Sequence, residues 1–162
     1  MHDFRNLKLM LSALFLMILT GCLEKLDPDD VKTVKYSYQD SSVPPPYHRS
    51  FDITVEPDKA HIQVDSYGDI LVDSTFSITT TAFENLIFTI NNANLQSGEA
   101  KAGQGCTGGT SERLSITSTD KKVYEGRFEH CGGNRIPARL GDYEKVVLEI
   151  KKLIPNLNHL LK

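Results

Sequence analysis

The chain has 162 residues, with 18 basic and 21 acidic side chains and a net charge of −3. Nucleic-acid-binding proteins carry a basic excess, so this balance argues against that class. The length suits one domain that buries a hydrophobic core.

The first 21 residues have the pattern of a secretory signal peptide. Arg5 and Lys8 make the start positive, and the stretch from Leu9 to Leu19 is apolar except for Ser12. A membrane-spanning helix needs about 20 apolar residues, and this run is much shorter. A short apolar run followed by small residues therefore favours a signal peptide over a permanent span.

The sequence Leu19-Thr20-Gly21-Cys22 resembles the lipobox of bacterial lipoproteins. The resemblance covers residues 1–22 and implies cleavage before Cys22, a diacylglycerol thioether on its sulfur and acylation of its freed amine. Each buried methylene contributes about 0.8 kcal/mol, so two or three acyl chains hold a protein firmly on a membrane. Leu23, where inner-membrane lipoproteins carry Asp, points to the outer membrane, facing the periplasm. The alternative is an uncleaved anchor in which Cys22 is incidental.

This interpretation divides the chain into three parts. They are a signal peptide (1–21), the lipidated cysteine with a polar tether (22–30) and a single domain (31–162). The part that starts at Cys22 has 16 basic and 20 acidic residues.

Four stretches between residues 34 and 78 alternate apolar and polar side chains. They are Val34 to Tyr38, Phe51 to Val55, Ile62 to Val64 and Ile70 to Ile78. A period of two predicts strands with one buried face. Short polar links at 56–59 and 66–69 predict that the last three strands pair antiparallel as a meander.

The link between the first two strands contains Pro44, Pro45 and Pro46. Proline fixes φ and lacks an N–H group, so this link is expected to be extended, like polyproline II, and to stay out of the sheet.

The pattern changes to helical spacing between Ala82 and Ile90 and again between Tyr143 and Leu153. Between these helices, Leu114–Ile116 and Val123–Phe128 flank a turn at 119–121 and predict a hairpin. We therefore expect an α+β fold. It comprises an antiparallel sheet of about six strands (a four-strand meander, a helix, a hairpin and a helix), with two helices packed on one face.

With Cys22 lipidated, Cys106 and Cys131 remain as an even pair in an oxidising compartment. A disulfide between them would close a loop of about 26 residues, worth roughly 3–4 kcal/mol in the chain-entropy model. Antiparallel pairing of the hairpin would bring both cysteines to its open end. A reactive thiol or a metal site is the alternative, although the spacing is not that of a zinc site.

No catalytic motif is evident in the sequence. There is no G-x-S-x-G motif, and the histidines have no metal-ligand spacing, so no catalytic residue, metal or cofactor is expected. Charge is uneven: residues 51–73 hold six acidic side chains against one lysine, and residues 101–139 hold seven basic against four acidic ones. Such asymmetry can steer a charged partner, although ordinary solvated faces are the favoured explanation.

The loop residues Tyr47, His48 and Arg49 are the candidate partner-binding group. Tyrosine and arginine are enriched at interface hot spots, and a rigid loop loses little entropy on binding. The alternative is a crossover in which Tyr47 only packs on the sheet.

The motifs C-T-G-G at 106–109 and H-C-G-G at 130–133 are similar to those of uncharacterised bacterial lipoprotein domains. We expect a non-enzymatic, inhibitor-like or binding lipoprotein of the cell envelope, attached to the membrane by its lipid and contacting a protein or envelope partner. Two alternatives stay open. One is an envelope hydrolase with a dispersed site, and the other is a structural lipoprotein of envelope assembly.

Overall fold

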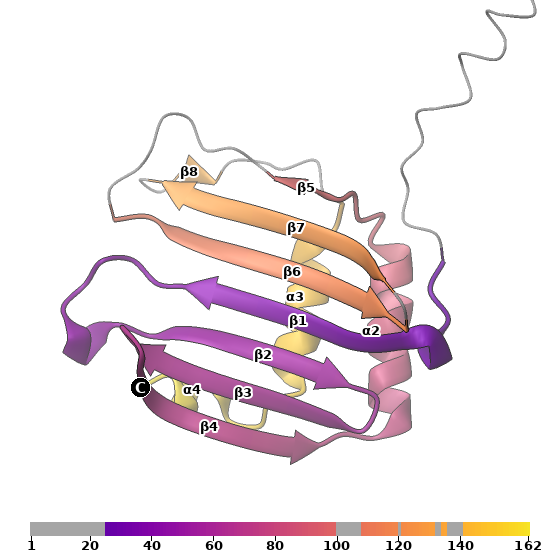
Figure 1. Cartoon of the computed structure of the whole chain (residues 1–162), viewed down its shortest axis with the longest axis horizontal. Coiled ribbons are helices and arrows are strands. Elements are labelled where there is room, and N and C mark those ends of the chain that lie inside the picture. Colours follow the sequence, from indigo (N-terminus) through magenta and orange to yellow (C-terminus); the bar gives the residue numbers. More distant parts are fainter. Residues whose placement is uncertain (1–24, 100–107, 120, 132–133, 136–140) are drawn as a thin grey trace, which may run out of the picture.

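A sheet of antiparallel strands with helices on one face forms the fold (Figure 1). The structure is a computed structural model of the chain. It describes residues 25–99, 108–119, 121–131, 134–135 and 141–162, without the side chains of 98–99, 131 and 134–135. The predicted α+β class is confirmed.

Six long strands make up the sheet, as predicted. They are β1 (Val31–Gln39), β2 (Ser50–Glu56), β3 (Lys59–Ser66), β4 (Asp69–Ser77), β6 (Thr110–Ser118) and β7 (Lys122–Cys131). Two-residue strands β5 (Gly98–Glu99) and β8 (Asn134–Arg135) pair with β7, and β5 does so in parallel. The order β4-β3-β2-β1-β6-β7-β5 places β1 between the meander and the hairpin.

Two amphipathic helices cover one face of this sheet, where the sequence predicts them. They are α2 (Thr80–Asn92) and α3 (Tyr143–Lys152), and a short α4 (Leu157–Leu160) follows. Thr79 caps α2 because its hydroxyl accepts a hydrogen bond from the Ala82 N–H. Each helix buries one stripe: Phe83, Leu86, Ile87 and Ile90 of α2, and Tyr143, Val146, Val147 and Ile150 of α3.

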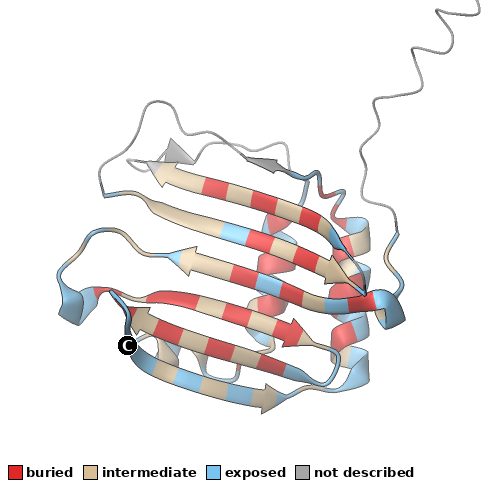
Figure 2. Cartoon of the chain, viewed as in Figure 1, coloured by how far each residue is buried: buried red, intermediate tan, exposed pale blue. Residues whose placement is uncertain are grey.

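The core lies between the helices and the sheet, and burial alternates along the strands (Figure 2). Ile53, Ile62 and Leu114 are fully buried examples on three strands. The opposite face of the sheet carries polar side chains, and no other described element covers it, as is common for antiparallel sheets.

The folded region begins before the strand that opens the predicted domain. Leu26 is paired with Asn91 of α2: the Leu26 N–H donates to Oδ1 at 2.8 Å, and Nδ2 donates to the Leu26 carbonyl at 2.9 Å. A 3₁₀ turn follows at Pro28–Asp30. The segment from Leu26 to Asp30, predicted as tether, is therefore docked on the helical layer.

Candidate functional site

The loop between β1 and β2 is held by hydrogen bonds at both of its ends. The Asp40 carboxylate accepts from the Ser41 N–H at 2.7 Å and from the Arg49 N–H at 2.9 Å. Pro45–Tyr47 forms a 3₁₀ turn rather than the predicted extended segment. The fixed φ of proline suits the first residues of such a turn as well as an extended chain, and the Tyr47 N–H closes it onto the Pro44 carbonyl at 2.9 Å.

The predicted trio Tyr47, His48 and Arg49 points into three different surroundings. Tyr47 is 74% exposed, whereas His48 is 2% exposed. Half-buried Arg49 donates to the His48 carbonyl at 2.7 Å and to the Lys162 carbonyl at 2.9 Å. The structure therefore presents only Tyr47 outward, and contact of the trio with a partner stays a prediction.

Tyr67, in the turn between β3 and β4, contacts the loop and stabilises its conformation. Its ring stacks on His48 at 4.0 Å between centroids, and its hydroxyl donates to the Val43 carbonyl at 2.6 Å. Its φ of +54° is rare for a bulky residue, and Gly68 follows with +97°. The contacts of Tyr67 with the loop therefore offset the unfavourable backbone conformation of this bulky residue in the turn.

Exposed apolar side chains occur in the loop, in the turn and at the start of β4. In the described part of the chain, six large hydrophobic residues are exposed, and four of them are Tyr47, Tyr67, Ile70 and Leu71. The loop and the turn are also joined by a hydrogen bond from Ser66 Oγ to the Pro45 carbonyl at 2.8 Å. We call this surface, formed by residues 43–47 and 67–71, the tip.

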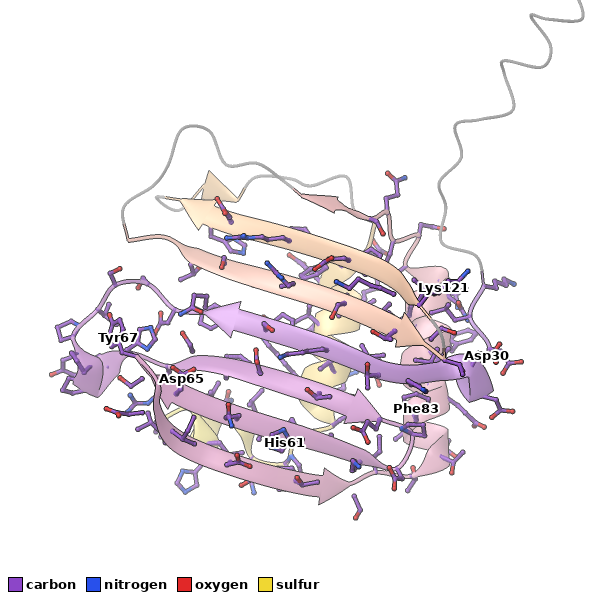
Figure 3. All side chains as sticks on the ribbon, in the orientation of Figure 1. Asp30, His61, Asp65, Tyr67, Phe83 and Lys121 are labelled. Carbon is purple, nitrogen blue, oxygen red and sulfur yellow. The ribbon has the colours of Figure 1, made fainter. Side chains whose placement is uncertain are left out.

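The tip lies at the end of the sheet opposite the point where the chain enters the fold. Tyr67 and Asp30 mark these two ends in Figure 3. The nine residues of β1 connect them and span about 30 Å at the rise of a β-strand.

The uncovered face of the sheet carries the charge asymmetry seen in the sequence. Arg113 and Arg127 lie opposite each other in register on β6 and β7. Each has a carboxylate partner, Glu125 at 3.5 Å and Glu129 at 3.1 Å respectively. Glu125 also pairs with Lys122 at 2.8 Å, so two carboxylates serve three basic side chains on this half of the face.

On the acidic half, Lys35 pairs with Asp52 at 2.7 Å, and His61 with Asp73 at 2.9 Å. A shallow depression of about 510 Å³ lies on this face, lined by charged residues and serines. The side chains in it largely satisfy one another, which is typical of a solvated face.

A second cleft, of about 370 Å³, lies under α3 and was missed by the sequence analysis. It contains Glu112 of β6 and His130 of β7, with Nε2 and Oε1 3.1 Å apart. A signal was available, because Glu112 shares the parity of the core residues Leu114 and Ile116. A carboxylate in a core-facing position breaks the alternation that otherwise holds along the strand.

The predicted cysteine sites lie outside what the structure describes. Cys22 and Cys106 are outside the described residues, and Cys131 is described only in its backbone. β6 begins at Thr110, which pairs with His130, so the two strand ends meet at the open end of the hairpin as predicted. Lipidation of Cys22 and the Cys106–Cys131 disulfide stay predictions.

Metal ligands, membrane-spanning helices and known protein families do not indicate what this chain does. Within the described residues, no three His, Cys, Asp or Glu side chains gather to hold a metal ion. None of the helices in this part of the chain has the length and apolar character needed to cross a membrane. No protein-family model matches the chain, and no curated protein matches its sequence.

Proposed function

We propose that this chain is a lipid-anchored binding protein of the cell envelope that holds a protein partner at its tip. The observation that carries the proposal is the exposure of Tyr47 and Tyr67 on a loop and a turn that are joined by hydrogen bonds, with Ile70 and Leu71 exposed at the start of the strand that follows the turn. Exposed apolar groups that cluster, rather than scatter singly, mark interaction sites.

The tip is ordered before any partner arrives. Asp40, His48 and Tyr67 fix the loop through the hydrogen bonds and the ring stacking described above. Ordering a loop on binding costs free energy, so a surface that is already fixed retains more of its contact energy as affinity. Tyr47 is an aromatic side chain of the kind found at hot spots.

The surroundings of the tip indicate the chemistry of the partner. Asp65 and Asp69 flank the turn that carries Tyr67, and Asp69 is exposed. A protein surface with an apolar pocket and basic side chains at its rim complements this arrangement, since interfaces pair apolar centres with polar rims of opposite charge.

The anchor and the tip would work together. If lipidated Cys22 holds the chain, the membrane lies at the end where Leu26 docks on α2, and the tip projects away from it. The lipid would then keep the protein at the membrane surface while the tip reaches a partner about 30 Å farther out.

A photo-crosslinking amino acid at position 47 in growing cells tests the binding surface. We expect one discrete protein adduct from position 47 and none from position 88, because Phe88 is similarly exposed (69%) but lies on α2. With the purified partner, Tyr47→Ala should weaken binding at least tenfold and Phe88→Ala should not. Equal adducts at both positions, or full affinity of Tyr47→Ala, would contradict the proposal.

The anchor is tested separately with Cys22→Ser. This variant should leave the membrane fraction and still bind the purified partner in solution. If it stays in the membrane fraction, the lipid attachment is wrong while the tip can still be correct.

A further inference from the structure

The outer face of α2 differs from that of α3 in charge. The exposed residues of α2 include a single charged one, and they are Thr80, Thr81, Glu84, Asn85, Phe88 and Asn92. The exposed residues of α3 are mostly charged, and they are Glu144, Lys145, Leu148 and Lys152. Charged groups are the most costly to remove from water, so the outer face of α2 is the easier of the two to cover.

Phe88 lies in the middle of this outer face. Its residue is 69% exposed, although burial of a phenylalanine side chain contributes about 1.5–3 kcal/mol. A single exposed apolar residue is common on protein surfaces, so the surroundings of Phe88 decide whether it marks a contact.

The docked N-terminal segment lies beside Phe88. Asn91, which makes both hydrogen bonds to Leu26, follows Phe88 by three positions, so the two side chains are neighbours on the surface of α2. A groove of about 430 Å³ is lined by Phe88 and Asn91 of α2 and by Pro28 of the 3₁₀ turn. Figure 1 shows α2 at the end of the sheet where this segment enters. Phe88 therefore belongs to the surface from which the chain continues toward Cys22.

The proposed anchor would bring this surface to the membrane. Four residue steps separate Cys22 from Leu26, and an extended chain covers at most about 14 Å in that distance. A tethered surface meets the bilayer intramolecularly, at a high effective concentration. A contact that is too weak to hold the protein on its own therefore forms once the lipid is inserted.

We propose that the outer face of α2 rests on the membrane, with the Phe88 ring at the boundary between the lipid headgroups and the acyl chains. The inference rests on the proposed lipid anchor and adds a second contact with the same bilayer. Large apolar side chains on a helix occupy this boundary when the helix lies in the plane of the membrane. Because α2 runs across the strands, this orientation leaves β1 pointing away from the bilayer (Figure 1).

Tryptophan fluorescence tests the contact, because the chain contains no tryptophan. Phe88→Trp places a single fluorophore on α2, and Leu148→Trp is the matched control, because Leu148 is 58% exposed on α3. The lipidated full chain is bound to vesicles of phosphatidylcholine and phosphatidylethanolamine with brominated acyl chains, which quench tryptophan on contact. We expect at least twofold quenching and a blue shift of the emission at position 88, and neither at position 148.

Flotation with the vesicles separates failure of the contact from failure of the anchor. A chain that does not float with them would overturn both the anchor and the contact of α2. If the chain floats but position 88 emits as it does in soluble Cys22→Ser protein, or if position 148 is quenched equally, the contact is wrong while the anchor stands. A blue shift at position 88 without quenching would mean that protein rather than lipid covers this face, which also overturns the proposal.

Discussion

At the scale of single residues, the buried hydroxyl of Tyr124 costs stability. Tyr124 is 1% exposed, and its hydroxyl lacks a partner among the described residues. A buried polar group without a hydrogen bond costs about 1–3 kcal/mol, so Tyr124→Phe should raise the free energy of unfolding by about 1 kcal/mol. Urea unfolding measures this change.

Tyr67→Phe is the matched control for that substitution. It removes a hydroxyl that donates to the Val43 carbonyl, and it should not raise the free energy of unfolding. If both variants are stabilised equally, the gain at Tyr124 has another cause than the missing partner.

Burial of Tyr124 should also make the free energy of unfolding fall at high pH. Burial raises the pKa of Tyr124 from 10.0 to about 12. The Tyr124 phenol ionises at a lower pH in the unfolded chain than in the folded protein. Its contribution to the free energy of unfolding is therefore complete below pH 10 and is lost as the pH rises through 12. A shift of this size corresponds to roughly 2–3 kcal/mol.

Urea unfolding of the protein and of Tyr124→Phe between pH 9 and 12 measures the alkaline loss of the free energy of unfolding. The variant should lose less free energy of unfolding than the protein does. Equal loss in both would show that Tyr124 ionises with an ordinary pKa. Tyr36 and Tyr143 shift in the same direction and remain in both proteins.

At the scale of elements, the loop before α3 meets the end of α2 closely. Gly141 has φ +75°, and a Cβ placed there would collide with the carbonyl oxygens of Ala93 and Asn94. The Asp142 N–H donates to the Ala93 carbonyl at 2.7 Å, which locks the two helices together. Gly141→Ala should therefore lower the free energy of unfolding by about 3 kcal/mol, as strain and collision combine.

Gly68→Ala separates these two causes. Gly68 also has a positive φ, of +97°, but a Cβ there meets nothing within 4 Å. Gly68→Ala should lower the free energy of unfolding by about 1 kcal/mol, from backbone strain alone. Thermal unfolding of both variants gives the comparison, and equal losses would contradict the close approach at Gly141.

The sequence predicts the elements better than it predicts their partners. Alternation from Val34 to Ile78 locates four strands, and helical spacing locates α2 and α3, because each pattern is local. The pairing of β1 with β6 is not local: Tyr36 lies opposite Leu114, 78 positions along the chain. No turn links these strands, so nothing in the sequence states which edge of the meander receives the hairpin.

The structure of the tip also depends on contacts between separate segments, which the sequence pattern does not reveal. Pro44 to Arg49 is recognisable as a rigid loop with an aromatic residue, but its composition does not indicate that His48 turns inward. Burial of His48 depends on stacking against Tyr67, which comes from a different hairpin. Conversely, Glu112 could have been found from its parity alone, because its core-facing position follows from Leu114 and Ile116.

At the scale of the whole molecule, the proposed anchor fixes which end of the sheet faces the membrane. Four residue steps separate Cys22 from Leu26, and an extended chain covers at most about 14 Å in that distance. Leu26 is held by Asn91, so the end of the sheet that carries Asp30 should lie near the lipid surface.

Energy transfer from two labelled positions to an acceptor on the lipid headgroups tests this orientation. Lys121 lies at the near end: its carbonyl accepts from the Ser118 N–H, and Thr119 donates to Asp30. Position 47 lies at the tip. In lipidated protein on vesicles, a donor at 121 should transfer more energy than a donor at 47, because the two ends differ in height by about the length of β1.

The Cys22→Ser protein supplies the baseline, since without the lipid neither donor should approach the acceptors. Greater transfer from position 47 than from position 121 would mean that the tip faces the membrane, and the partner would then have to be sought at the bilayer. Equal transfer would mean that the docked segment around Leu26 does not orient the domain. The predicted inequality therefore tests both the anchor and the docking of the chain on α2, on which the outward placement of the tip depends.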